Sequence, residues 1–237
     1  MVSIPAPVAE PQPAISPVGR IFGIFFSPKA TFEDIVRKPG WLLPVIILAV
    51  LGLAVAIGLN QKMNWREFMS QQIEKSPQAS TMSAEQKEQR IEAGAKFAPI
   101  SSYVFGVPAP LILILVVALI MWGDKTALSI VAHAYVPVML SNLVFLLVLF
   151  LKAPGTIDLE NPVATNLATF FPEDTAKWLQ AFGKNMDIFT LWVVALIAIG
   201  FAATNPKKLK GGTSFGIAFG MLAAYLAIRV GLAFALS

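Results

Sequence analysis

Three residues that could take part in chemistry lie within one long apolar run, residues 129–151. They are His133, which is the only histidine of the chain, Pro137 and Asn142. An imidazole with an ordinary pKa of about 6.5 could relay protons or bind a ligand near neutral pH. The alternative is a neutral imidazole that is hydrogen-bonded between helices. Asn142 has the same two interpretations, an interhelical bond or a substrate contact.

The run that carries these residues is long enough to cross a membrane. A hydrocarbon core of about 30 Å needs about 20 helical residues at about 1.5 Å each. Polar groups are costly in lipid, and Pro137 withholds a hydrogen bond from the carbonyl of His133, four residues earlier. We therefore expect this span to face protein, with the other spans packed around it.

The composition predicts a polytopic α-helical membrane protein. Hydrophobic residues make up 56% of the 237 residues, and charged residues only 14%. The chain has no cysteine, so disulfides and zinc–thiolate sites are excluded, and a single histidine excludes a His-rich metal site. No catalytic constellation or nucleotide-binding motif is present. We expect no enzyme activity, no cofactor, no metal and no nucleic-acid partner.

The predicted fold class is all-α, with five transmembrane helices and additional amphipathic helices. A Pro/Ala-rich segment, residues 1–19, is expected to be disordered, and residues 20–237 form the membrane domain. Ser83 and Gln86 form a capping box within a polar stretch. We expect external helical segments at about 60–101 and 152–187. The five spans are predicted at residues 42–59, 102–122, 129–151, 188–203 and 213–236.

A short amphipathic helix is predicted before the first span. Ser27 and Pro28 are typical of a helix start, and Pro39 with Gly40 ends the helix. We expect this helix to lie at the membrane interface, and the alternative is a helix that faces solvent and leads into the first span.

The distribution of basic residues predicts the orientation. With five spans, the N-terminal side holds eight basic and four acidic residues in short segments. The opposite side holds nine basic and ten acidic residues in two long stretches. Basic residues concentrate in short cytoplasmic loops. We expect an inner (plasma) membrane protein with a cytoplasmic N-terminus and an external C-terminus.

The last span carries a packing motif and one charge. Gly212, Gly216, Gly220 and Ala224 recur every four residues, a pattern that lets another helix approach closely. Its partner could belong to the same chain or to a second copy. Arg229 either extends to the interface or pairs with an acid such as Asp187.

Several segments resemble bacterial-type members of the Yip family, the Ypt/Rab-interacting membrane proteins. The matching segments are FFSPKATFEDI at residues 25–35, HAYVPVML at 133–140 and DIFTLWVVALIAIGFA at 187–202, followed by the small-residue last span. The resemblance implies a five-helix membrane domain with a cytoplasmic N-terminus. Eukaryotic relatives bind small GTPases, but the short N-terminal part and long external stretches of this chain argue against GTPase binding.

We therefore expect a non-enzymatic membrane scaffold or organiser. Its partners would be the lipid bilayer and other membrane proteins or further copies of itself. The alternative is a small transporter or channel component with a polar cavity around His133, Pro137 and Asn142. A water-accessible pocket that reaches these residues would favour the transporter, and burial with hydrogen bonding would favour the scaffold.

Overall fold

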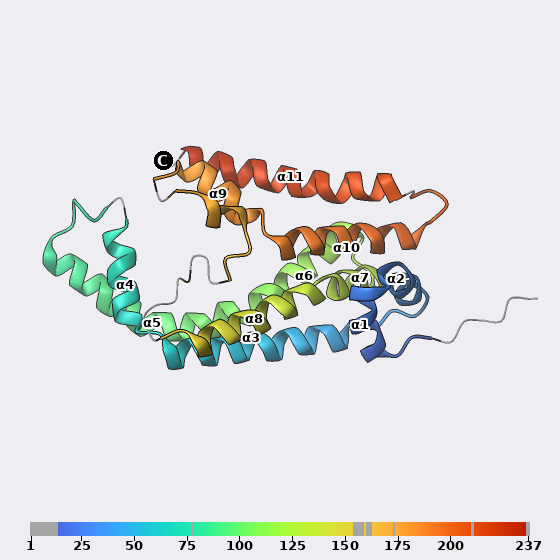
Figure 1. Ribbon diagram of the computed structural model, residues 1–237, viewed down its shortest axis with the longest axis horizontal. Helices are drawn as coiled ribbons and strands as arrows, with labels where there is room; N and C mark the ends of the chain where they lie inside the picture. The colour runs from blue at the N-terminus through green and yellow to red at the C-terminus, as the bar shows by residue number, and fades with distance from the viewer. Residues whose placement is uncertain are drawn as a thin grey trace, which may run out of the picture.

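The computed structural model describes residues 14–76, 78–153, 159, 163–172, 174–209 and 211–235. Figure 1 shows long helices that run side by side, with shorter helices at both ends. The predicted all-α fold is confirmed. Four helical segments are long and apolar enough to cross a membrane: Leu42–Lys62, Ala84–Met121, Lys125–Leu151 and Gly211–Ala235.

Three predicted spans appear close to their expected bounds. They are α3 (Leu42–Lys62), α10 (Ile188–Thr204) and α11 (Gly211–Ala235). The 17 residues of α10 extend about 26 Å at about 1.5 Å each, less than a typical hydrocarbon core of about 30 Å. The count of five crossings therefore stays a prediction.

The N-terminal part forms two short helices, α1 (Pro17–Phe26) and α2 (Pro28–Arg37). The prediction of a helix start at Ser27 and Pro28 is confirmed, although the Ser27 side chain makes no capping hydrogen bond. The separate helix α1 was not predicted, and Ser16 caps it by accepting the N–H of Gly19. Residues 17–19 thus belong to a helix, and residues 1–13 of the segment expected to be disordered lie outside the described residues.

The second span is longer than expected because its helix extends beyond the apolar residues. After α4 (Trp65–Glu74), helix α5 (Ala84–Gly106) continues through a turn at Val107 into α6 (Pro108–Met121). The capping box predicted at Ser83 and Gln86 is present. Helix α4 lies within the first external segment that was expected to be helical, residues 60–101.

The third span is broken rather than continuous. Helix α7 (Lys125–Ala134) ends before Tyr135, and α8 (Val136–Leu151) begins after it. Pro137 therefore lies in the first turn of α8 and not in the middle of a helix, where its ring would clash. The N–H of Tyr135 reaches the carbonyls of Val131 and His133, so the His133 carbonyl has a partner at the break.

Between α8 and α10 the described residues include η1 (Leu167–Phe170) and α9 (Lys177–Asn185). Helix α9 lies within the second external segment that was expected to be helical, residues 152–187. Helix α9 packs against η1 and α11. An added Cβ at Gly183 would lie 2.8 Å from the backbone nitrogen of Ala168, so this contact requires glycine.

The buried core is concentrated where α1 and α2 pack against α7 and α10. We call this region the closed end, and it lies at the right of Figure 1. Fully buried large side chains there include Ile24, Phe32, Ile130 and Leu196. We call the other end, with α4, the first half of α5 and α9, the open end. Most of α7 is buried, as expected for a central span.

Candidate functional site

A buried ion pair joins α1 to α2 at the closed end. Arg20 is 5% exposed and Asp34 is 2% exposed. The Nε and Nη2 atoms of Arg20 each lie 2.8 Å from Oδ2 of Asp34. On the exposed side, Nη2 of Arg37 lies 3.6 Å from Oδ1 of the same carboxylate. Both carboxylate oxygens therefore face a guanidinium, which offsets the cost of removing these charges from water.

Small residues allow the helices around this ion pair to approach closely. A Cβ added at Gly23 of α1 would lie 2.3 Å from Oγ1 of Thr31 on α2. A Cβ added at Gly200 of α10 would lie 2.4 Å from Cγ2 of Ile130 and 3.0 Å from Cδ1 of Phe32. Gly200 thus marks the point where α2, α7 and α10 meet, and the packing there leaves no room for a larger side chain.

Sequence analysis did not identify Arg20 and Asp34 as a pair. A signal was nevertheless present, because Arg20 lies one turn before Ile24 and Asp34 lies between Phe32 and Ile35. Each charge therefore falls on the apolar side of a short helix. A buried charge needs an opposite charge nearby, so two such charges on adjacent helices would be expected to pair.

His133 lies within α7 and is only 1% exposed. Its Nδ1 atom lies 2.8 Å from the carbonyl oxygen of Ser129, one turn earlier in the same helix. The hydrogen bond of the imidazole, which was expected to join two helices, is thus formed within α7. Pro137 is also buried. His133 is therefore buried with a hydrogen-bonded ring, as a structural role requires. The structural role itself stays a prediction.

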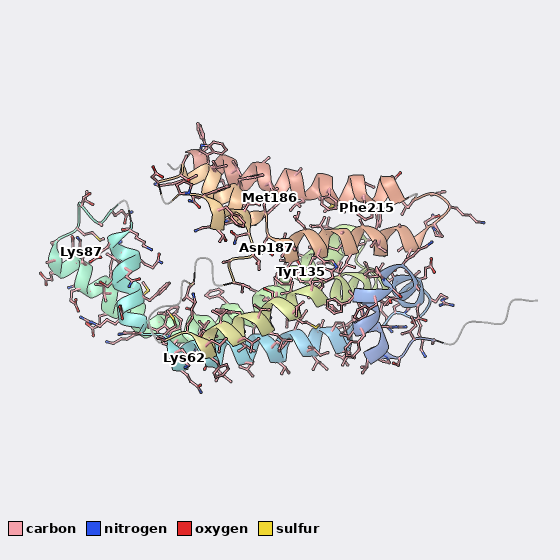
Figure 2. The ribbon with its side chains drawn as sticks, viewed as in Figure 1. Lys62, Lys87, Tyr135, Met186, Asp187 and Phe215 are labelled. Carbon is pink, nitrogen blue, oxygen red and sulfur yellow. The ribbon has the colours of Figure 1, made fainter. Side chains whose placement is uncertain are left out.

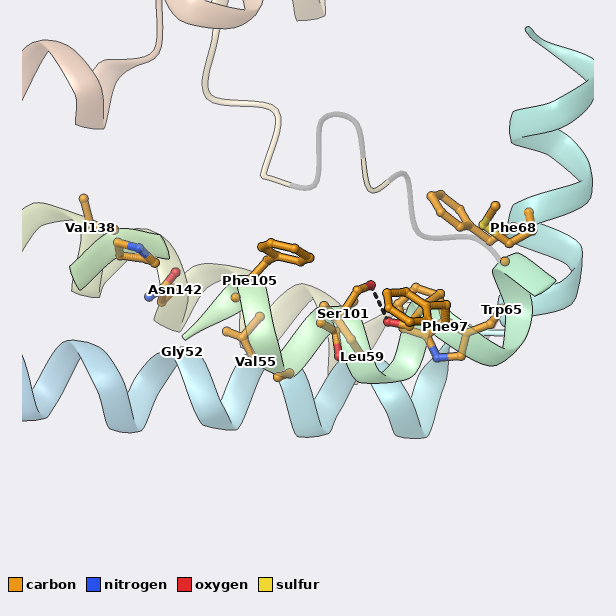
Figure 3. Close-up of a pocket in the computed structure, with 17 residues that line it drawn as sticks. Gly52, Val55, Leu59, Trp65, Phe68, Phe97, Ser101, Phe105, Val138 and Asn142 are labelled. Carbon is orange, nitrogen blue, oxygen red and sulfur yellow. Dashed lines mark hydrogen bonds between the residues drawn. The ribbon is translucent and has the colours of Figure 1, made fainter. Parts of the chain in front are cut away.

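A groove of about 510 Å³ lies at the open half of the molecule, and Figure 3 shows it. We call it the aromatic groove. Asn142 lines it, whereas His133 and Pro137 do not, so this groove is not the cavity expected around all three residues. The lining residues are Gly52, Val55, Ala56, Leu59, Trp65, Phe68, Met69, Gly94, Phe97, Ala98, Ser101, Ser102, Phe105, Gly106, Pro110, Val138 and Asn142.

A chain of hydrogen bonds positions the walls of the aromatic groove. Nε1 of Trp65 donates to Oδ1 of Asn60 at 3.1 Å. Nδ2 of Asn60 donates to Oγ of Ser102 and to the carbonyl of Ala56, each at 2.8 Å. Ser102 in turn donates to the carbonyl of Pro99 at 2.7 Å. This chain connects α3, α4 and α5, and sequence analysis missed it because Asn60 and Ser102 are far apart in the sequence.

The pairing of Arg229 with Asp187 is wrong. Oδ1 of Asp187 accepts the backbone N–H groups of Phe189, at 2.9 Å, and Thr190, at 3.1 Å. Its Oδ2 accepts the hydroxyl of Thr165. The carboxylate therefore caps α10, which satisfies its acceptors without a cation. Arg229 is exposed on α11 and forms no ion pair among the described residues.

The small residues of α11 point away from the rest of the molecule. All four are exposed. A Cβ added at each of the three glycines would meet no atom within 4 Å. We call this surface the small-residue face, and it comprises Gly212, Gly216, Gly220 and Ala224.

The described residues contain no group of three or more histidine or acidic side chains that could hold a metal ion. Acidic side chains instead cap helices or form ion pairs, as Asp124, Asp187 and Asp34 do.

Fold and composition together define an all-α, multi-pass integral membrane protein. The Yip1 domain matches residues 22–230, and the chain belongs to this family. It is similar to the membrane protein YknW of Bacillus subtilis (strain 168), with 29% identity over 214 residues that cover 86% of this chain and 87% of the relative. No solved structure matches. The resemblance stated from the sequence is thereby confirmed.

Proposed function

We propose that this protein is a non-enzymatic membrane scaffold that acts by binding other transmembrane helices. The observation that carries the proposal is the small-residue face of α11. It is exposed along its whole length, from Gly212 to Ala224, which is about 18 Å at about 1.5 Å per residue.

The two faces of α11 differ in their surroundings. Ser214 and Ala218 are buried on the side that packs within the chain. The small-residue face begins two residues before Ser214 and repeats every four residues. Two residues correspond to about 200° around a helix, so this face lies almost opposite the packed one. An intramolecular partner for it would have to lie on the far side of α11.

A face of this kind suits a helix partner better than lipid. In a bilayer, helices associate through close packing and not through a hydrophobic driving force, and small residues allow their backbones to approach. The partner that this face suits is a membrane-spanning helix, either from a second copy of the chain or from another membrane protein.

The membrane location and orientation complete the proposal. We place the protein in the inner (plasma) membrane, with the N-terminus cytoplasmic and the C-terminus external. The density of basic residues in the short segments that include Arg20, Lys29, Lys125 and Lys208 supports this orientation. The burial of His133 supports the scaffold rather than the transporter alternative. Membership in the Yip1 family and similarity to a protein described as a membrane protein support a role without catalysis.

Site-specific photo-cross-linking in native membranes tests the proposal. A photo-cross-linking residue at Ala224 lies on the small-residue face, and one at Met221 lies on α11 outside this face as a matched control. We expect protein cross-links from Ala224 and not from Met221. A product of twice the chain mass identifies a second copy. The double substitution Gly216→Leu and Gly220→Leu should remove the Ala224 product, because leucine prevents close approach of the backbones.

Two outcomes would contradict the proposal. One is cross-linking of Ala224 to lipid alone, and the other is an unchanged protein product in the double variant. Thermal denaturation in detergent should not show a loss of stability for the double variant, because a Cβ added at either position meets no atom within 4 Å.

A further inference from the structure

We propose that the aromatic groove binds one acyl chain of a membrane lipid. The groove lies among α3, α4, α5, α6 and α8, away from the small-residue face of α11, so this inference does not rest on the proposed function.

The inner end of the groove lies at the middle of the membrane-spanning segments. Gly52 is the middle residue of Leu42–Lys62, and Val138 is the middle residue of Lys125–Leu151. Both line the groove. The middle of a spanning helix lies near the middle of the bilayer. The groove therefore ends near the bilayer midplane.

The outer end of the groove lies at the level of the membrane interface. Trp65, which begins α4, lines this end, and Figure 3 shows it near Phe97 and Phe68. Tryptophan favours the boundary between hydrocarbon and headgroups. The groove thus extends from one interface to the midplane and occupies a single leaflet.

The length of the groove matches one leaflet. Along α5 and α6 it extends from Gly94 to Pro110, which is about 24 Å at about 1.5 Å per residue. Half of a bilayer, with its headgroup region, measures about 20 to 22 Å. A lipid that inserts its chain from the outer end would reach the inner end of the groove.

The size of the groove suits a hydrocarbon chain and not a helix. Its volume of about 510 Å³ lies within the range of about 300–1,000 Å³ that is typical of small-ligand sites. An α-helix of 10–12 Å diameter and about 24 Å length occupies roughly 1,900 to 2,700 Å³. The groove is therefore too small for a helix of a partner protein.

The walls are chemically suited to hydrocarbon. Aromatic and aliphatic side chains dominate, and the hydroxyl of Ser101 is already bonded to the carbonyl of Ala98, at 2.9 Å. Water would need two to four polar partners, which these walls do not offer. An empty groove would forfeit contacts along both walls. Asn142 is the exception, since its side chain forms no hydrogen bond among the described residues.

Photolabelling in defined vesicles tests the proposal. The full chain is reconstituted in phosphatidylethanolamine and phosphatidylglycerol with a trace of phosphatidylcholine that carries a diazirine in one acyl chain. Mass spectrometry then locates the label. We expect label on the groove face of α5, between Phe97 and Phe105. Ala98→Phe and Ser101→Phe should each reduce this labelling roughly tenfold, because the added aromatic ring occupies space that the acyl chain needs.

The controls separate a site from general lipid contact. Val104 lies on the same helix, is 53% exposed and does not line the groove, so Val104→Phe should leave labelling unchanged. Equal labelling in the Ala98, Ser101 and Val104 variants would overturn the proposal. Ser101→Phe decides the outcome if Ala98→Phe does not fold, since the Ser101 hydroxyl bonds only within its own helix.

Asn142 distinguishes an acyl chain from a polar ligand. Asn142→Leu should keep or increase labelling, because leucine extends the apolar wall. Loss of labelling in this variant would mean that the amide recognises a polar group, and would overturn the proposal. The double variant Gly216→Leu and Gly220→Leu should label like the unchanged chain, so failure of the proposed function and failure of this inference are separate results.

Discussion

The closed end and the open end of the molecule differ in how their helices fill space. At the closed end, α2, α7 and α10 meet at Gly200 with no room for a larger side chain, and the ion pair of Arg20 and Asp34 is enclosed. At the open end, α4 and α5 project beyond the bundle (Figures 1 and 2). The aromatic groove lies between these two helices and α3.

This difference indicates where the molecule is fixed and where it can bind. Charges at the closed end are buried only because each has a partner, so this end holds the amphipathic N-terminal helices against the spans. At the open end the exposed aromatic residues Phe97 and Phe105 border a space that the chain itself does not fill. The contacts that we propose with lipid and with partner helices therefore lie at the open half and on the outer face of α11.

The largest effect should come from breaking the buried ion pair. Asp34→Asn leaves the guanidinium of Arg20 buried without a countercharge, which should cost about 3–5 kcal/mol. Thermal or denaturant unfolding in detergent measures the change. The double variant Arg20→Met with Asp34→Leu should lose less than Asp34→Asn, since it buries no unpaired charge. A single variant as stable as the unchanged chain would show that the ion pair is not enclosed as described.

Substituting glycines at the two surfaces should sharpen the comparison. Gly200→Leu places a side chain against Ile130 and Phe32 and should destabilise the protein by about 1–3 kcal/mol, a typical cost of overpacking. Gly216→Leu is the matched control, because a Cβ added at Gly216 meets no atom within 4 Å. Denaturation of both variants in the same detergent measures the difference. Equal stabilities would contradict the contrast between packed and open surfaces.

The smallest effect concerns Asp124, on the exposed rim of the closed end. Its carboxylate accepts the backbone N–H of Ala127, at 2.8 Å, and Nε1 of Trp122, at 2.6 Å. The backbone hydrogen bond from Ala127 is the main cause that lowers the pKa of Asp124 below its ordinary value of 3.8. A lowered pKa adds stability above that value, and this stability is lost as the pH falls through the folded-state pKa.

Replacing Asp124 tests the direction of this pH dependence of stability. Asp124→Ala should cost about 1 kcal/mol at neutral pH, as expected for a helix N-cap. Unfolding measured from pH 7 down to pH 3 should show a smaller difference between the variant and the unchanged chain at the acidic end. A difference that grows on acidification would contradict the assignment.

Several elements could be predicted because their signals are local. The capping box at Ser83 and the helix start at Pro28 each depend on residues within one or two turns. The break at Tyr135 was missed, because a proline in an apolar run does not reveal whether the helix bends around it or restarts before it. Helix α1 was missed because it begins at Pro17, within the Pro/Ala-rich segment that was expected to be disordered.

The candidate sites depended on contacts between distant segments. Asp187 was expected to pair with Arg229. Its carboxylate instead accepts backbone hydrogen bonds at the start of α10. Asn142 was identified as a polar group in a span, but its position on the groove wall depends on how α8 packs beside α3 and α5.

By itself, the sequence determined that this chain is an all-α membrane protein of the Yip1 family without cysteine chemistry, because hydrophobic length and residue types are properties of the chain alone. Only the tertiary structure decided that Arg20 meets Asp34, that Gly200 is enclosed while Gly216 is uncrowded, and that the aromatic groove opens beside Asn142. The physical reason is that burial and cavity shape arise from the packing of helices that are far apart in the sequence, and a periodic apolar pattern is compatible with many such packings.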